Sequence, residues 1–127
     1  MQQGTVVVLG ASTDRNKYGN KSVRAYLKRG WTVYPVNPKA DEIEGVKAFK
    51  SLKEITGPID RVTVYLPPTV VITLLDDIAS LHPQETYFNP GSESLEVMEK
   101  AAALGLNPIA ACSIVDIGMT PSQFPGQ

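Results

Sequence analysis

The chain has 127 residues, of which 43% are hydrophobic, and this length suits one domain over residues 1–127. Its formal net charge of -1 at pH 7 argues against a polybasic nucleic-acid surface. Its one cysteine, Cys112, excludes an internal disulfide and fits a reducing compartment. No apolar run approaches the roughly 20 residues of a membrane helix, and no basic region precedes the first apolar residues, so we expect a cytoplasmic protein that contacts neither membrane nor nucleic acid.

The first predicted strand is followed by an unusually long loop. Residues 6–9 form a continuous apolar run that stops at Gly10, which is typical of a strand buried on both faces. Small, polar and basic residues then precede apolar residues of helical spacing at positions 23–30, and we expect Asn20 to cap this helix. Connections of this kind usually span about 2–6 residues, so the length of the loop suggests binding.

Two further strands are separated by a polar connection. Residues 31–36 are rich in β-branched and aromatic side chains and predict the second strand. The connection at residues 37–60 predicts little local order beyond a short extended piece at 46–49 and one helical turn at 51–55. Residues 61–67 predict the third strand, which two prolines bring to an end.

The second half of the chain continues the alternation of helix and strand. An apolar stripe at positions 71–81 predicts a helix that begins at the two prolines, because proline suits a first helical turn. Residues 85–89 predict a fourth strand, residues 95–104 a helix and residues 109–112 a fifth strand. We expect the tail from residue 113 onward to be irregular, with exposed apolar side chains that suit contact in a homodimer: Ile114, Val115 and Ile117.

This order of elements predicts an α/β fold. Strands that alternate with helices in so short a chain form βαβ units, whose right-handed crossovers give an open, doubly wound and mainly parallel sheet. Ligands of such sheets bind beyond the carboxyl ends of the strands. The residues directly after each strand are therefore the candidates for function, and few of them are the acids and bases that catalysis usually employs.

The first of these loops has the chemistry of a phosphate site. Gly10 permits a tight turn that exposes backbone amides, and the N-terminus of the following helix favours anions. Ser12 can donate a hydroxyl hydrogen bond, and three cations can pair with phosphate: Arg15, Lys17 and Lys21. The alternative is that Gly10 merely turns the chain and that the lysines are solvated.

The loop after the second strand argues against NAD. An NAD site expects an acidic residue there to hold the ribose hydroxyls, but the chain has Asn37, Pro38 and Lys39. The glycine fingerprint is also incomplete, because Ser12 and Arg15 stand where two of its glycines belong. A cation in place of the acid suits a ribose that carries a phosphate, as in NADP and coenzyme A.

The remaining loops leave more than one interpretation open. Residues 65–68 can form an apolar wall against a base or an alkyl arm, or simply begin a helix. Asn89 can face a ligand or belong to an ordinary turn, and Cys112 is expected to be buried. His82 lies at the wrong end of its helix for the site, so we expect neither a catalytic triad nor a metal site. Asp77 is expected to face solvent.

The ordered set of these segments resembles a known family. The segment VVVLGAS followed by KYG, and then YPVNPKADEIEGVKAFKSLKEI and VTVYLPP, is similar to the small bacterial and archaeal CoA-binding domain proteins. These proteins are stand-alone relatives of the CoA-binding domain in the α subunit of succinyl-CoA synthetase. The likeness extends from about residue 5 to residue 112.

The resemblance implies both a fold and a ligand. It implies a Rossmann-like sheet of five strands in the order 3-2-1-4-5. It also implies that the diphosphate of CoA lies over the first loop, the adenosine near the second, and the pantetheine arm past the prolines toward Asn89. The residues that it marks as cofactor-binding are Gly10, Ala11, Ser12, Lys17, Asn37, Pro38, Lys39, Pro67, Pro68 and Asn89.

We therefore expect a protein that binds coenzyme A or an acyl-CoA in a non-catalytic or regulatory role, without catalytic residues or a metal. One alternative is an interaction subunit with a vestigial cleft. The other is an enzyme that uses NADP or another nucleotide, for which the candidate acids and bases are Tyr18, Tyr65 and Cys112.

Overall fold

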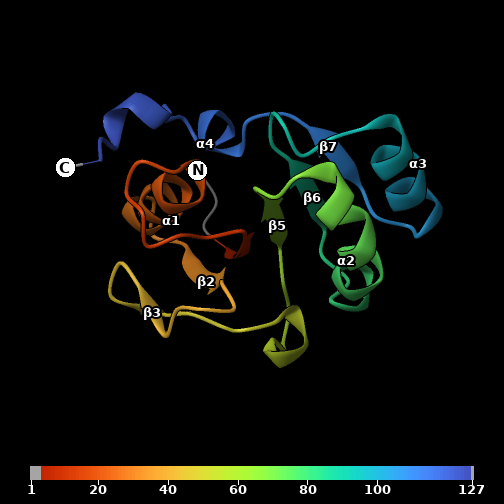
Figure 1. Ribbon diagram of the computed structural model, residues 1–127, viewed down its shortest axis with the longest axis horizontal. Coiled ribbons are helices and arrows are strands. Elements are labelled where there is room, and N and C mark those ends of the chain that lie inside the picture. The colour runs from red at the N-terminus through yellow and green to blue at the C-terminus, as the bar shows by residue number, and fades with distance from the viewer. Residues whose placement is uncertain (1–3, 127) are drawn as a thin grey trace.

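The computed structural model describes residues 4–126, and these form a five-stranded sheet between two layers of helices (Figure 1). Neighbouring strands run parallel throughout, in the order β2-β1-β5-β6-β7. The predicted α/β class, with a doubly wound and Rossmann-like sheet, is confirmed. The strands are β1 (Thr5–Leu9), β2 (Thr32–Val36), β5 (Arg61–Val64), β6 (Glu85–Phe88) and β7 (Pro108–Ala110).

Helices cover both faces of this sheet. They are α1 (Tyr18–Lys28), α2 (Pro68–Ser80), α3 (Leu95–Ala103) and the short α4 (Ser113–Asp116). Val7 and Leu9 of β1 pack with α2 and α3, whereas Val6 and Val8 pack with α1 and α4, because successive side chains of a strand point to opposite faces. This two-sided burial explains why β1 is a continuous apolar run. None of the helices within residues 4–126 has the length and apolar character needed to cross a membrane.

The order of the strands differs from the expected 3-2-1-4-5. The third strand predicted along the chain, β5, pairs with β1 and not with β2, so the order is 2-1-3-4-5. All four residues of β5 are buried, which a central position between two strands provides and an edge position does not. The outer edge of β2 is met instead by a single parallel bridge between Val36 and Phe49, at the extended piece predicted near residues 46–49.

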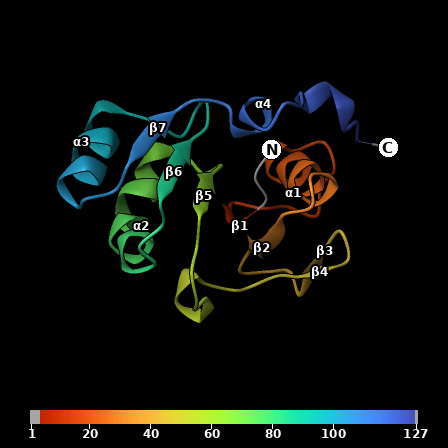
Figure 2. The ribbon, with the colours of Figure 1, turned by 180° about the vertical axis from the view of Figure 1, so that it is seen from behind.

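The connection between β2 and β5 carries a small hairpin. Its strands, β3 (Glu42–Ile43) and β4 (Val46–Lys47), pair antiparallel, and the view from behind shows them beyond β2 (Figure 2). Glu44 and Gly45 form the turn, both with positive φ. A 3-10 turn at Leu52–Glu54 follows, close to the predicted helical turn.

Helix α1 begins earlier than predicted. Lys17 is its N-cap, and Asn20, which was expected to be the cap, lies in the first helical turn with its side chain fully buried. The side-chain amide of Asn20 instead donates, through Nδ2, to the main-chain oxygen of Ser12 and to the carboxylate of Glu44. The cap prediction was wrong because the Asn20 side chain binds Glu44, a residue that is distant in the sequence. The predicted start of α2 at Pro68 is confirmed.

The C-terminal segment, residues 113–126, packs on α1 and is not irregular throughout. It contains α4 and a 3-10 turn at Pro121–Gln123. Ile114 and Ile117 are buried in the core on the α1 face, so the expectation that they are exposed was wrong. Val115 is 56% exposed. The tail therefore presents much less apolar surface for a homodimer contact than the sequence suggested.

Candidate functional site

The loops after β1, β2 and β5 surround a cleft of about 560 Å³ at the carboxyl edge of the sheet, termed the main cleft. It lies where the chain changes from one half of the sheet to the other, the usual position of a ligand in such folds. Asn89 lines a neighbouring pocket, and Lys39 and Pro68 lie outside the lining of the main cleft. The predicted site residues that line the main cleft are Gly10, Ala11, Ser12, Lys17, Asn37, Pro38 and Pro67.

Two glycines bring the first loop, residues 10–17, close to its neighbours. Gly10 has a φ of +90°, and a Cβ atom there would lie 2.8 Å from the main-chain oxygen of Tyr65. A Cβ atom on Gly19, in the first turn of α1, would lie 2.1 Å from the main-chain oxygen of Gly10. Both positions therefore require glycine, and they hold the start of α1 directly against the turn that ends β1.

The first loop folds on itself through short hydrogen bonds. The amide of Asp14 donates to Oγ of Ser12 at 3.0 Å, and the amide of Asn16 donates to Oδ1 of Asp14 at 3.0 Å. Within residues 4–126, the amides of Ala11, Ser12 and Thr13 donate to no acceptor of the protein. Backbone donors of this kind can bind an anion.

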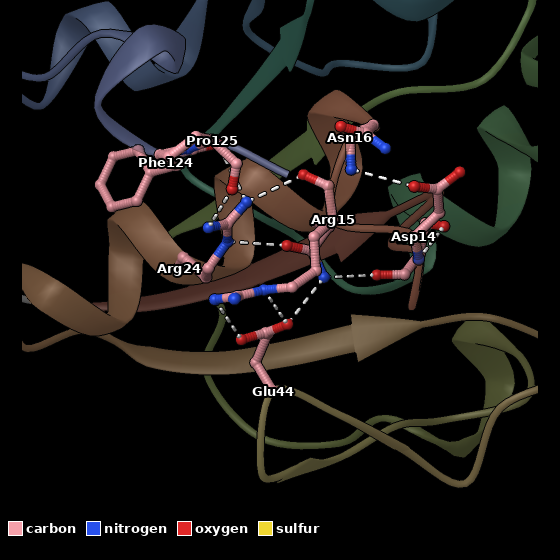
Figure 3. A network of polar contacts seen from close by, with 9 residues as sticks. Asp14, Arg15, Asn16, Arg24, Glu44, Phe124 and Pro125 are labelled. Carbon is pink, nitrogen blue, oxygen red and sulfur yellow. Dashed lines mark hydrogen bonds and ion pairs between the residues drawn. The ribbon is translucent and has the colours of Figure 1, made fainter. Parts of the chain in front are cut away.

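Arg24 of α1 joins this loop to the C-terminal segment (Figure 3). Its Nη2 donates to the main-chain oxygens of Arg15 at 2.9 Å and of Phe124 at 3.0 Å. Its Nη1 donates to the main-chain oxygen of Pro125 at 2.9 Å, and its Nε donates to Oδ1 of Asn20 at 2.8 Å. Burial and the neighbouring Arg15 charge lower the pKa of Arg24, while Glu44 opposes that shift. One side chain of α1 thus fixes two other segments of the chain, the first loop and the C-terminal segment.

Of the three cations predicted to pair with phosphate, two have partners in the protein. Arg15 forms an ion pair with Glu44 of the hairpin, with 3.2 Å between Nε and Oε2 (Figure 3). The Lys21 ammonium lies 5.5 Å from the centroid of the Tyr18 ring. Lys17 is exposed and lines the main cleft, which leaves it the best placed of the three to meet a ligand there.

Asn37 joins the loop after β2 to the first loop. Its Nδ2 donates to the main-chain oxygen of Ala11 at 2.9 Å, and its Oδ1 accepts from the amide of Lys39 at 2.7 Å. Its own amide donates to the main-chain oxygen of Phe49 at 2.9 Å. Asn37 therefore shapes the cleft through contacts within the protein.

A lysine that sequence reasoning missed lines the main cleft. Lys50 follows the bridge to β2, and its Nζ donates to the main-chain oxygen of Ala40 at 2.9 Å and to Oδ1 of Asp41 at 2.8 Å. The hydrogen bond from Lys50 lowers the pKa of the Asp41 carboxyl. Lys39 is exposed beside the cleft. The signal for Lys50 was weak because it lies in the connection that showed little local order.

The wall of the cleft opposite the first loop is largely apolar. It includes Leu52, Leu66, Val70 and Leu74, with Pro67 at the start of α2. This arrangement supports the interpretation of residues 65–68 as an apolar wall, and α2 also begins there, so the two alternatives are compatible. Asp77 of α2, which was expected to face solvent, lines the same cleft.

Two smaller cavities continue the main cleft along the same edge of the sheet. The middle cavity has a volume of about 500 Å³, and the distal pocket has a volume of about 210 Å³. The middle cavity shares five lining residues with the main cleft: Gly10, Lys17, Tyr65, Leu66 and Pro67. The distal pocket is lined by Tyr18, Tyr65, Asn89, Pro90, Cys112, Ile114 and Pro121.

The side chain of Asn89 is engaged on both of its polar atoms. Its Nδ2 donates to Oγ1 of Thr63 at 2.7 Å and to the main-chain oxygen of Val64 at 3.0 Å. Its Oδ1 accepts from the amide of Ser113 at 2.9 Å. Asn89 thus fixes the start of α4 relative to β5, and it lines the distal pocket as a structural residue.

Tyr65 lines all three cavities. Its hydroxyl lies 3.4 Å from Oγ of Ser113. Burial, which disfavours the phenolate, raises the pKa of Tyr65 to about 12, so its side chain is neutral at physiological pH. Cys112, expected to be buried, is partly exposed and lines the distal pocket.

Comparison with known proteins assigns a family. A family model for the CoA binding domain matches residues 4–118. The chain is 42% identical over 69 residues to the α subunit of ADP-forming acetate–CoA ligase II of Pyrococcus furiosus. That match takes in 52% of this chain and 15% of the ligase subunit, so the chain spans a small part of that relative.

Solved structures share the fold. A conserved hypothetical protein from Pyrococcus furiosus matches with a TM-score of 0.80 and 31% identity, over 91% of this chain and 99% of that chain. The dinucleotide-forming acetyl-coenzyme A synthetase 1 of Ca. Korarchaeum cryptofilum, in complex with phosphate and ADP, matches with a TM-score of 0.74 and 26% identity, over 84% of this chain and 25% of that chain. The chain therefore belongs to the family of CoA-binding domains, and part of it is similar to part of an ADP-forming CoA ligase subunit.

Proposed function

We propose that this chain binds coenzyme A or an acyl-CoA in the main cleft. The observation that carries the proposal is the meeting, in one cleft, of a cationic loop with an apolar wall. Lys17 and the backbone amides of Ala11 and Ser12 suit the diphosphate, since phosphate oxygens accept charge-assisted and amide hydrogen bonds. The side chains of Leu52 and Leu74 suit an adenine ring. Membership of the CoA-binding domain family supports this choice among nucleotides.

A second positive charge is available for the ribose phosphate that distinguishes CoA from its dephosphorylated form. Lys50 lines the main cleft beside the loop after β2. One of its present partners, the carboxylate of Asp41, has a side chain that is 95% exposed, so exchanging that partner for phosphate costs little. The ammonium has three donors, so its hydrogen bond to the main-chain oxygen of Ala40 can remain. Lys39, marked by the family resemblance, is exposed nearby and is the other candidate.

We propose a regulatory role without chemistry on this chain. The titratable side chains that line the main cleft are Lys17, Lys50, Tyr65 and Asp77. The pKa of Tyr65 is raised to about 12, far from the range in which a general base works near neutral pH. The activity named for the ligase relatives belongs to much longer proteins, and it forms no part of this proposal.

Calorimetric titration with CoA, dephospho-CoA and NADPH tests the proposal. We expect a measurable Kd for CoA, weaker binding of dephospho-CoA, and little heat from NADPH. Tighter binding of NADPH than of CoA would favour a nucleotide-using enzyme instead. Equal and negligible heats from all three ligands would remove CoA binding as the function.

A matched pair of lysine variants separates a specific site from general attraction to anions. Lys17→Ala removes a charge from the cleft, whereas Lys28→Ala removes an exposed charge from the last turn of α1, at the opposite end of that helix. Loss of one charge-assisted hydrogen bond weakens binding by about 1.5–3 kcal/mol, or roughly tenfold to a hundredfold in Kd. We expect that loss for Lys17→Ala and an unchanged Kd for Lys28→Ala.

A further inference from the structure

The three cavities are neighbours along the carboxyl edge of the sheet. The main cleft and the middle cavity share the walls made by Gly10, Lys17 and Pro67. The middle cavity and the distal pocket share Tyr18, Tyr65 and Pro90. A ligand with its nucleotide in the main cleft and a linear arm in the middle cavity would therefore have the end of that arm beside the distal pocket.

The walls of the distal pocket are built by distant parts of the chain. Tyr18 comes from the start of α1, Pro90 from the loop after β6, and Cys112 and Ile114 from the junction of β7 with α4. Among the described residues that line the pocket, none carries a charged side chain. Tyr65 is neutral there, and both polar atoms of the Asn89 side chain already have partners. The pocket is thus the uncharged end of a row of cavities that begins with lysines.

Contacts within the protein fix the shape of the distal pocket. The carboxylate of Asp116 in α4 lies 2.9 Å from Nη1 of the buried Arg61. Arg29 donates to the main-chain oxygen of Ile117 at 2.9 Å, just beyond α4. The amide of Ser113 donates to Asn89. These bonds hold the segment that carries Cys112 and Ile114 against the rest of the fold.

We propose that the distal pocket binds the short, uncharged acyl group of an acyl-CoA, so that the physiological ligand is the thioester rather than free coenzyme A. The inference rests on the proposed function, because the acyl group reaches the pocket only if the nucleotide occupies the main cleft. Pockets that hold a whole drug-sized ligand measure about 300–1,000 Å³, whereas this one measures about 210 Å³ and suits a fragment of a few atoms. An acyl group that ends in a carboxylate is disfavoured, since no charged side chain among the described lining residues offers it a partner.

Titration of the wild-type protein with CoA, butyryl-CoA and succinyl-CoA tests this inference. We expect butyryl-CoA to bind about tenfold more tightly than CoA, because the methylene and methyl groups of its acyl chain leave water for the apolar walls of the pocket. Succinyl-CoA, similar in length but charged at its end, should bind more weakly than CoA itself. Equal Kd values for CoA and butyryl-CoA, or tighter binding of succinyl-CoA than of butyryl-CoA, would overturn the inference and leave CoA binding intact. Failure of all three to bind would overturn the proposed function as well.

Two variants then locate the acyl group. Cys112→Leu fills part of the distal pocket, whereas Val115→Leu adds a methylene to an exposed side chain of α4 that does not line it. We expect Cys112→Leu to bring the ratio of the Kd values for CoA and butyryl-CoA from about ten to about one, and Val115→Leu to leave it unchanged. Binding of CoA by Cys112→Leu shows that the variant is folded. If Cys112→Leu binds no CoA, Cys112→Ser is used in its place. Serine is close to cysteine in size and leaves the pocket open, so we expect Cys112→Ser to leave the ratio of the two Kd values unchanged. A ratio that stays near ten in Cys112→Leu, or falls in Cys112→Ser, contradicts the placement.

Discussion

The guanidinium of Arg24 donates to the main-chain oxygen of Arg15 at 2.9 Å, so helix α1 holds the far end of the loop that begins at Gly10. The same side chain binds the main-chain oxygens of Phe124 and Pro125. The shape of the proposed phosphate site therefore depends on the C-terminal segment, although no residue beyond 121 lines a described cavity of the edge.

Replacement of Arg24 should loosen both segments at once. Arg24→Gln removes charge-assisted hydrogen bonds to the first loop and to the C-terminal segment, and we expect the free energy of unfolding to fall by about 1–3 kcal/mol. CoA binding should also weaken, because the loop amides lose their fixed position. Urea denaturation and calorimetry measure the two effects. Lys28→Gln, an exposed position on the same helix, is the control, and equal losses in both variants would contradict the role of Arg24.

The two lysines near the loop after β2 can be separated with dephospho-CoA. Lys50 lines the main cleft, whereas Lys39 is exposed outside its lining. If Lys50 meets the ribose phosphate, Lys50→Ala should weaken CoA roughly tenfold to a hundredfold and leave dephospho-CoA nearly unchanged. Lys39→Ala should have a smaller effect on the same ratio. A larger effect from Lys39→Ala would assign the phosphate to the residue that the family resemblance marks.

Gly19 gives a test of the close contact between α1 and the first loop. In an ordinary helix, Gly→Ala is stabilising by up to about 1 kcal/mol. Here the new Cβ would lie 2.1 Å from the main-chain oxygen of Gly10, so one backbone must move. We expect Gly19→Ala to lower stability by about 1–3 kcal/mol and to weaken CoA binding.

Gly105→Ala is the matched control for Gly19→Ala. Its Cβ meets nothing within 4 Å, and its cost comes from a positive φ far from the cleft. We expect a loss of about 1–2 kcal/mol of stability there with an unchanged Kd for CoA. Unchanged CoA binding in Gly19→Ala would show that the loop tolerates displacement.

The elements with strong local patterns were predictable from sequence. The continuous apolar run of β1 and the apolar stripe of α2 predicted their types, and Pro68 marked the start of α2. The strand order was not predictable in this way, because β5 carries no local signal that tells which edge of β1 or β2 it joins. The weak piece at Phe49, and not β5, meets the free edge of β2.

Sequence distance explains the partners that the sequence did not indicate. Asn20 was expected to cap a helix, but its side chain binds Glu44, 24 residues away in the sequence. Arg15, predicted to pair with phosphate, forms an ion pair with the same carboxylate. Ile114 and Ile117 follow no regular spacing in the sequence, yet both are buried in the cluster that includes the apolar residues of α1. Local pattern shows which residues can hydrogen-bond or pack, but the tertiary fold determines their partners. The glycine turn could be placed from sequence because its requirement for positive φ is local.

The phenol of Tyr65 should make the protein sensitive to alkaline pH. Its pKa is about 12 in the folded protein, against about 10 in an unfolded chain. The unfolded chain therefore loses the proton first, so the stability is fully present below about pH 10 and is lost as the pH rises toward about 12. The loss from this one group is at most about 3 kcal/mol. Tyr65→Phe keeps the ring against the cavities and removes the titration.

We expect the urea midpoint of Tyr65→Phe to fall less than that of the wild type between about pH 9 and about pH 11.5. Part of the loss should remain, because burial also raises the pKa of Tyr87 to about 12. Tyr18→Phe, at a side chain that is 60% exposed, is the control and should follow the wild type. If Tyr65→Phe instead loses stability in parallel with the wild type, the Tyr65 hydroxyl is solvated, and the wall that it contributes to all three cavities is not fixed as the structure has it.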